Sequence, residues 1–557
     1  SSHVKGLSAR APQYNQDGTL VVVTKPSLKE EAYFGDSYSL ELNAAYTQTF
    51  AEKHTIDAKA VFTVSESNGS YFWASRKDYL SATVDQLFAG SSIGMQNSGN
   101  SDEGGRMGLV GRLKYDFDSR YYIEGSFRYD GSDNFAPGHR WGFFPSVALA
   151  WDITEEPFFK SLNLKNVNLL KLRGSYGQTG TEAGVNRFGY LSTYSLAENA
   201  ICIGGNLQSG FNEGALVSPE LLSWYTRNSL NYGVDAAFFN HHLKGSVDYF
   251  FYVTKGGLVS PADRYVVPLG TSLPQIKSEN EHRREGFEVS LRWDDKIGSD
   301  FYYEVGTNMT YYNNLYVKNQ GESLSDLKNP YKRNTHQTDY YGIMYMNNGL
   351  YQTPEQVLGL PRRLQSSATK LGDIAYEDIN GDGKIDGEDQ VRWGMPTAPH
   401  FTYGFDFILG YKGFTLSGLL YGTGKRNMEF GVTTKKNEAI WVLNDYQLDY
   451  WREDNRDATF PRISLEASAN GSNNQAASTF WVKNASFLRL KNLTLEYDFK
   501  YKLLRRVKWL NTCRANITGT NLFTISDVMD YFDPETASTR GGYPVQRVYS
   551  LGVTIGF

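Results

Sequence analysis

The chain has 557 residues, a net charge of −5 spread along its length and two distant cysteines, which argues against nucleic-acid binding and against a disulfide framework. No apolar run approaches the ~20 residues that a membrane-spanning helix needs, so the composition excludes a helical membrane protein. The mean hydropathy of −0.47 still allows a membrane-spanning barrel, because alternating strands hide their apolar residues from an average, and the 39 tyrosines and 32 phenylalanines favour one.

The first predicted elements form a hairpin. Every second residue is apolar along 36–49, and after a turn at 51–54 the same period continues along 56–64, which is the pattern of two half-exposed strands. A weaker pattern at 19–25 suggests one further strand. Residues 1–17 have no apolar core after a basic start, so no signal peptide is predicted there.

The alternation recurs along the rest of the chain and predicts fifteen strands. Its clearest instance is the last, where Tyr549, Leu551, Val553, Ile555 and Phe557 are apolar and the residues between them are small or polar. The thirteen strands after the first hairpin are predicted at 107–115, 121–129, 142–153, 168–177, 229–238, 243–252, 286–294, 301–312, 401–410, 413–422, 486–499, 511–523 and 546–557.

The connections between these strands alternate between short and long. The longest are 313–400 and 423–485, and a strict alternation of short turns with long loops is typical of outer-membrane barrels. The predicted fold is therefore all-β, a transmembrane antiparallel β-barrel. Because bacterial single-chain barrels close with an even number of strands, an odd count suggests the C-terminal part of a larger barrel.

Polar side chains lie opposite the apolar set on the predicted strands. Burying each ion in a dry core would cost several kcal/mol of folding free energy, whereas a water-filled lumen carries no such cost. The alternative, a pair of soluble stacked sheets, seldom carries such long loops at one end only. The inward-facing set is Glu41, Asn43, Lys171, Arg173, Asp235, Lys244, Asp248, Glu304, Asn308, Arg514 and Asn516.

Residues 378–389 match the twelve-residue calcium loop. Oxygen donors at positions 1, 3, 5, 7, 9 and 12, with Gly383 at the sharp turn, can wrap one hard cation, so a structural calcium ion is predicted. Position 12 holds the shorter Asp389 instead of glutamate, and no amphipathic helices flank the loop. A metal-free turn rich in Asp, Asn and Gly is the alternative. The predicted ligands are Asp378, Asn380, Asp382, Lys384 through its carbonyl, Asp386 and Asp389.

No combination of nucleophile, base and orienting group is evident, so the sequence predicts no enzyme. The substrate is not identified, because the loop aromatics Trp73, Trp224, Trp441 and Trp451 could stack on sugar rings or pack against a lid protein.

Several sequence blocks resemble the SusC/RagA-type TonB-linked outer-membrane transporters. The strongest is 370–386, which contains the calcium-type motif, and the resemblance extends over nearly the whole chain. The blocks that carry it, in order, are 127–132, 140–146, 246–249, 370–386, 401–405, 411–414, 486–495, 519–523 and 533–535.

The resemblance implies a 22-stranded barrel closed by an N-terminal plug, a periplasmic segment that engages TonB and a SusD-like surface lipoprotein over the barrel. Residues 1–557 would be its C-terminal barrel portion, with the plug and the opening strands expected from elsewhere. The expected function is TonB-dependent uptake of a large nutrient, an oligosaccharide or a peptide, across the bacterial outer membrane. The alternatives are a structural barrel that serves as an assembly platform and an open porin.

Overall fold

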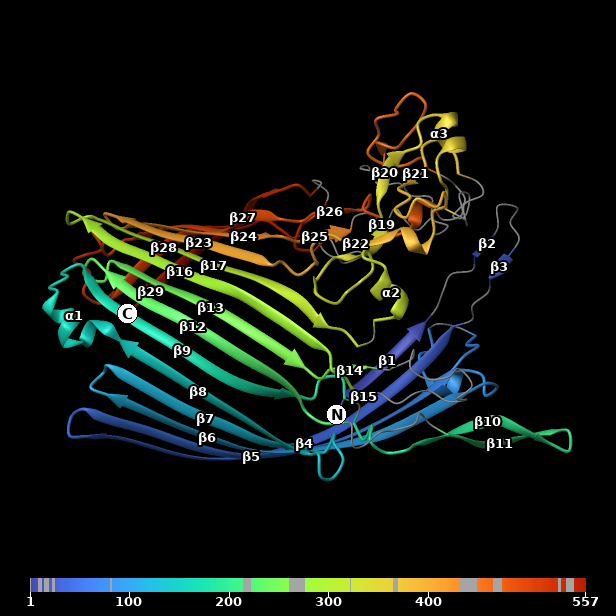
Figure 1. Cartoon of the computed structure of the whole chain (residues 1–557), viewed down its shortest axis with the longest axis horizontal. Helices are drawn as coiled ribbons and strands as arrows, with labels where there is room; N and C mark the ends of the chain where they lie inside the picture. The colour runs from blue at the N-terminus through green and yellow to red at the C-terminus, as the bar shows by residue number, and fades with distance from the viewer. Residues whose placement is uncertain are drawn as a thin grey trace.

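The structure is a computed structural model. It describes residues 2–8, 13–14, 20–22, 26–80, 83–185, 187–213, 222–259, 276–320, 322–363, 369–429, 448–463, 473–528, 532–536 and 545–557. Its main feature is one antiparallel sheet of seventeen strands. Figure 1 shows this sheet curving from β4–β8 at the bottom of the view to β23–β27 at the top.

Sixteen strands form the wall of this sheet, and each pairs with the next in an antiparallel register. The seventeenth, β18 (Gln337–Thr338), adds two residues to the side of β17. In pairing order the wall is β1 (Ser2–Ser8), β4 (Ser27–Phe50), β5 (His54–Arg76), β6 (Gln96–Phe117), β7 (Tyr121–Ser132), β8 (Trp141–Asp152), β9 (Val167–Thr181), β12 (Tyr225–Phe238), β13 (Leu243–Lys255), β16 (Glu281–Ile297), β17 (Phe301–Lys318), β23 (Phe401–Tyr411), β24 (Phe414–Gly424), β27 (Phe487–Asp498), β28 (Thr512–Ser526) and β29 (Val548–Gly556).

All fifteen predicted strands are confirmed, but the count was one short. The additional strand, β1, pairs with the first residues of β4, and neither segment has a clear apolar period. Within the predicted strand at 19–25, Leu20–Val22 forms β3 and pairs with β2 (Gln13–Tyr14) in a separate two-stranded sheet. The rest of that range lies outside the described residues.

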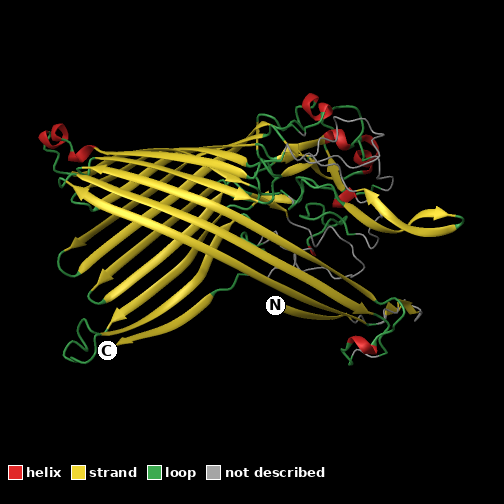
Figure 2. Ribbon diagram, turned by 90° about the horizontal axis from the view of Figure 1, so that it is seen from below, coloured by secondary structure: helices red, strands yellow, loops and turns green. Residues whose placement is uncertain are grey.

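The two ends of the wall differ in their connections. Figure 2 shows short turns at one end, and long loops with most of the helices at the other. The turn between β23 and β24 is only Lys412–Gly413, and both residues have positive φ, 48° and 88°, which matches the twist of a tight hairpin.

Strict alternation by length is nevertheless wrong. At the loop end the β7–β8 connection, 133–140, is shorter than 153–166 at the turn end, which carries the short helix α1 (Pro157–Ser161). Strand direction reverses at every pairing, so it alone decides at which end of the wall a connection lies. Most connections at the loop end are the longer ones, but not all.

The two faces of the wall differ as the alternation predicts. Leu172, Val234 and Val247 lie side by side across β9, β12 and β13 and are 39%, 37% and 49% exposed. Their sequence neighbours Arg173 and Asp235 face the other way and pair with each other. An apolar band facing out and ion pairs facing in are expected of a strand with lipid on one side and water on the other. We call the charged side the inner face.

No helix within the described residues is long and apolar enough to cross a membrane.

The facing assignment predicts a large difference between two adjacent substitutions. Val247→Arg places a cation in the apolar band and should destabilise the inserted barrel by about 2 to 4 kcal/mol. Ser246→Arg, on the inner face opposite Asp235, should be much milder. Heat-dependent gel mobility of the protein in outer membranes measures the folded fraction, and equal losses for the two variants would contradict the assignment.

Candidate functional site

The inner face carries a lattice of ion pairs. Arg173 on β9 donates to Asp235 on β12 at 2.8 Å and to Asp248 on β13 at 3.0 Å, so one guanidinium joins three neighbouring strands. Gly233 makes room for it, because a Cβ there would lie 2.7 Å from the Arg173 Cζ atom. These groups are partly exposed, so each pair stabilises the fold only modestly. The lattice provides a charged, water-compatible lining.

Several other inner-face arginines are neutralised in the same way. Each has a carboxylate partner on its own or a nearby strand, which fits the inward orientation predicted from the sequence. The pairs are Arg112 with Asp57, Arg128 with Asp130, Arg292 with Glu304 and Asp406, and Arg514 with Glu496.

One inner-face arginine holds a loop against the wall. Arg489 on β27 is 1% exposed and donates to Thr524 on β28 at 2.8 Å. It also pairs with Asp533 and Glu535, which lie in the connection from β28 to β29. A buried guanidinium needs such compensation, because an unpaired buried charge costs several kcal/mol. This part of a long loop is therefore folded inward.

A cavity of about 980 Å³ lies against the inner face of β5–β9 near the loop end. Its polar lining includes Arg106, which pairs with Glu182 from the loop after β9. The aromatic part is fixed by Trp224, whose Nε1 donates to the Arg140 carbonyl at 2.9 Å and whose ring lies 5.5 Å from that of Phe144. The cavity therefore offers both charged and aromatic surface.

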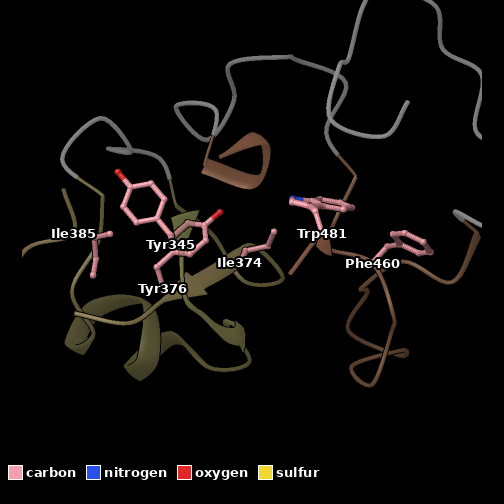
Figure 3. Packing of buried hydrophobic residues seen from close by; sticks show 6 residues of the cluster. All are labelled: Tyr345, Ile374, Tyr376, Ile385, Phe460 and Trp481. Atoms are coloured by element: carbon pink, nitrogen blue, oxygen red, sulfur yellow. The ribbon is translucent and has the colours of Figure 1, made fainter. Parts of the chain in front are cut away.

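The described parts of the two longest loops form one folded unit at the loop end of the wall. They contain β19 (Gly342–Tyr345), β20 (Asn347–Leu350), β21 (Ile374–Tyr376), β22 (Gln390–Trp393), β25 (Asn427–Glu429), β26 (Val482–Asn484) and the helices α2 (Leu324–Lys328) and α3 (Pro354–Gly359). Side chains from both loops meet in one buried core, drawn in Figure 3: Tyr345, Ile374, Tyr376, Ile385, Phe460 and Trp481. We call this assembly the loop unit.

A polar cluster at Asp373 links the two loops. The Asp373 carboxylate is fully buried and lies 2.7 Å from the Arg462 Nε atom, and it accepts a 3.0 Å hydrogen bond from the Asn474 side chain. Next to it, the Tyr376 hydroxyl donates to the Asn473 carbonyl at 2.6 Å, and burial raises the pKa of Tyr376 well above its usual value. Sequence reasoning missed this cluster, because no local pattern pairs residues a hundred positions apart.

The calcium-type motif forms a tight loop at the surface of this unit. The Asp378 carboxylate caps it from inside and accepts backbone N–H bonds from Gly381 at 2.7 Å and Gly383 at 2.8 Å. Both glycines have positive φ, 75° and 81°, which lets the backbone turn around that carboxylate. Asn380, Asp382 and Asp386 each accept a backbone N–H two residues further on.

Asp389 differs from the other predicted ligands. It is fully buried, and its two oxygens accept backbone bonds from Ile379 at 2.9 Å, Asn380 at 3.4 Å and Asp386 at 2.7 Å. It closes the loop from beneath, whereas Asn380, Asp382 and Lys384 are exposed at the surface. Across the described part of the chain, no three Asp, Glu, His or Cys side chains are gathered closely enough to hold an ion.

The tryptophans proposed as stacking surfaces in loops are mostly engaged within the protein. Trp451 is buried, with its Nε1 donating to Gln352 at 2.9 Å. The loop assignment of Trp73 is wrong, because it lies within strand β5, where the Lys29 ammonium group covers its ring at 4.6 Å from the ring centre. Trp441 lies outside the described residues.

The buried core of the loop unit predicts a local response to mutation. Ile374→Ala should cost about 2 to 5 kcal/mol of local stability, because Ile374 is fully buried and the substitution leaves a cavity. Hydrogen exchange should accelerate in 342–363, 369–393 and 473–486 and stay unchanged in the wall strands. Leu358→Ala, at an exposed position of the same unit, is the control, and equal exchange in the two variants would refute the core assignment.

Comparison with known proteins agrees with this architecture. The chain is 27% identical to TonB-dependent receptor P3 of Formosa agariphila over 84% of this chain and 47% of that protein. It is 28% identical to TonB-dependent receptor SusC of Bacteroides thetaiotaomicron over 80% of this chain and 43% of that protein. The chain thus spans about half the length of the curated relatives it matches.

A solved structure of the RagAB peptide importer in its open-open state superposes with a TM-score of 0.77, covering 100% of this chain and 58% of that one at 21% sequence identity. This likeness shows the fold. The family model described as TonB dependent receptor-like, beta-barrel matches residues 5–522. The wall is therefore that of an outer-membrane β-barrel, and the chain belongs to the TonB dependent receptor-like β-barrel family.

Proposed function

We propose that this chain forms the barrel wall of an importer that takes up a large nutrient, an oligosaccharide or a peptide, across the outer membrane with energy delivered through TonB. The observation that carries the proposal is the inner face of the wall, which is covered by ion pairs such as those of Arg173 with Asp235 and Asp248. A hydrated solute crosses such a surface without the cost of entering an apolar medium. No catalytic role is proposed, because the family is one of receptors and transporters.

Two alternatives use the same barrel differently. A structural barrel would serve as a platform for other proteins and move no solute, and an open porin would pass solutes without TonB. The printed names favour import, since one sequence relative is the TonB-dependent receptor SusC and the superposed solved structure is that of a peptide importer.

The importer and the porin differ in their need for energy. Uptake of the cognate nutrient by cells should require this gene and should stop when the proton gradient is collapsed or TonB is deleted. A porin would continue to pass the nutrient after either treatment, and a platform protein would show no uptake that depends on its gene.

We further propose that the loop unit docks a SusD-like surface lipoprotein. The unit joins the loops 313–400 and 423–485 through the core around Ile374 and Trp481, so it offers a preformed surface at the outer end of the wall. The test is a pull-down from the cells used for the uptake assay. A tagged transporter should retain the lipoprotein after detergent extraction, and Ile374→Ala should weaken this retention. A transporter that never retains such a partner would contradict this part of the proposal.

We propose, finally, that the loop 378–389 binds one structural calcium ion. Its donors are all hard oxygens, which is the chemistry calcium selects. Asp378, Asn380, Asp382, the Lys384 carbonyl and Asp386 would hold the ion, with the exposed Asp382 turning toward the others. Asp389 would contribute mainly as the buried brace beneath the loop, because it is fully buried, whereas Asp378, which also accepts three backbone N–H groups, is partly exposed.

Calcium removal is expected to be a local event. Chelation should increase proteolysis within 373–392 without changing the heat stability of the barrel, and Asp382→Ala should reproduce this in the presence of calcium. The midpoint should fall at roughly 10⁻⁴ to 10⁻³ M calcium, the range of extracellular modules. Asp454→Ala, at an exposed carboxylate outside the motif, is the control. Proteolysis that is insensitive to calcium would refute the site.

A further inference from the structure

A second, smaller pocket of about 260 Å³ opens on the inner face where β12, β13, β16 and β17 approach the loop end. It lies away from the larger cavity, which is formed by β5–β9. Four of its residues occupy one row across these strands in register, and they are Arg227, Thr254, His282 and Tyr316. Two residues further along β16, Arg284 lines the same pocket.

Two guanidinium groups face this pocket on aromatic supports. The Arg284 group lies 4.6 Å from the ring centre of Tyr312 and donates from Nε to the Asn314 side-chain oxygen at 2.6 Å. The Arg227 group lies 6.0 Å from the ring centre of Tyr252 and donates from Nε to the Thr254 hydroxyl at 3.3 Å. In both residues the Nε contact is to a neutral oxygen, so the terminal nitrogens remain available to a ligand.

These two arginines differ from others on the inner face. Arg112, Arg128, Arg173, Arg292 and Arg489 each lie within 4 Å of at least one carboxylate. Among the described residues, neither Arg227 nor Arg284 has a carboxylate within that distance. Two uncompensated guanidiniums that line one pocket repel each other, so a site that contains both is suited to an anion.

The other charged groups around the pocket do not cancel its positive charge. Asp339 lines the pocket and accepts from the Asn314 side chain at 2.7 Å and from the His400 ring at 3.0 Å. Arg283 also lines it and lies 3.4 Å from Glu285. With that pair cancelling, and with burial lowering the pKa of the His282 imidazole, the two guanidiniums outnumber the Asp339 carboxylate. The pocket therefore favours an anion, and a carboxylate has the planar pair of oxygens that a guanidinium fits.

We propose that this pocket binds a carboxylate group of the transported solute, with Arg227 and Arg284 donating to its oxygens and the flanking tyrosines packing on the residue or ring that bears it. The inference rests on the proposed import function and refines it, because it assigns an acidic substrate. A planar guanidinium recognises a carboxylate through two parallel hydrogen bonds, which makes arginine specific as well as attractive. The carboxylate can belong to a uronic acid of an oligosaccharide or to the C-terminus of a peptide.

Matched pairs of probes separate the carboxylate from the rest of the ligand. Binding of trigalacturonate and its methyl ester, and of trialanine and its C-terminal amide, is measured by calorimetry on the intact transporter extracted with its partners. We expect at least one acid to bind about tenfold more tightly than its neutral counterpart, the effect of one charge-assisted hydrogen bond. The pair that shows the difference identifies the source of the carboxylate.

The variants test the residues. Arg227→Gln and Arg284→Gln should each remove that preference for the acid and leave the affinity for the neutral probe unchanged, whereas Arg514→Gln, elsewhere on the inner face, should preserve the preference. Heat-dependent gel mobility confirms that each variant is folded. Three results would overturn the assignment. The unmodified protein could bind acid and neutral probes equally, the variants could weaken both probes equally, or neither acid could show saturable binding at millimolar concentration. Failure of the import proposal appears separately, as uptake that does not depend on the proton gradient.

Discussion

The constraint on which this structure depends is that backbone N–H and C=O groups inside a bilayer must bond to one another, because lipid offers them no partner. The wall meets it with continuous antiparallel registers from β1 to β29, the longest of which runs along the whole β4–β5 pair. Once the backbone is satisfied in this way, each side chain only has to suit lipid or water. One sheet can therefore expose Leu172 and Val247 to lipid and line its other face with ions.

The loops fall under a different constraint, since they lie in water and can form an ordinary core. The loop unit does so by joining two segments that are distant in sequence, with Ile374 and Trp481 in one buried cluster and Asp373 beside Arg462 and Asn474. A unit with its own buried core at the end of the wall can present a preformed surface to a partner. In the proposed importer, the inner face would line the path of the solute and the loop unit would hold the partner protein.

The strands were predictable because their signal is local. A period of two along one segment needs no knowledge of the partner strand, so all fifteen were found from the sequence. β1 was not predicted, because only its main-chain pairing defines it as a strand. Its partner residues Ser27–Tyr33 also have no alternating apolar set. The tight turn of 378–389 was likewise local, since Asp378 bonds to Gly381 and Gly383 only a few residues away.

What could not be predicted is long-range. The Arg489 contacts with Asp533 and Glu535 and the core of the loop unit join residues whose sequence separation leaves no periodic trace. The pocket with Arg227 and Arg284 emerges only from the register of four strands, because each arginine taken alone resembles the many others that the wall neutralises. Sequence patterns therefore report how each strand faces, and pairing decides which side chains meet.

The central claim, that one face of the wall meets lipid and the other water, is tested most directly by spin-label accessibility along β13. Single cysteines at 245–250, in a background without Cys202 and Cys513, would be labelled in the protein reconstituted in bilayers. The account predicts that collision with oxygen peaks at 245, 247 and 249, whereas collision with a water-soluble nickel chelate peaks at 246, 248 and 250. Accessibility to the two reagents that rises and falls together, without a period of two, would contradict it.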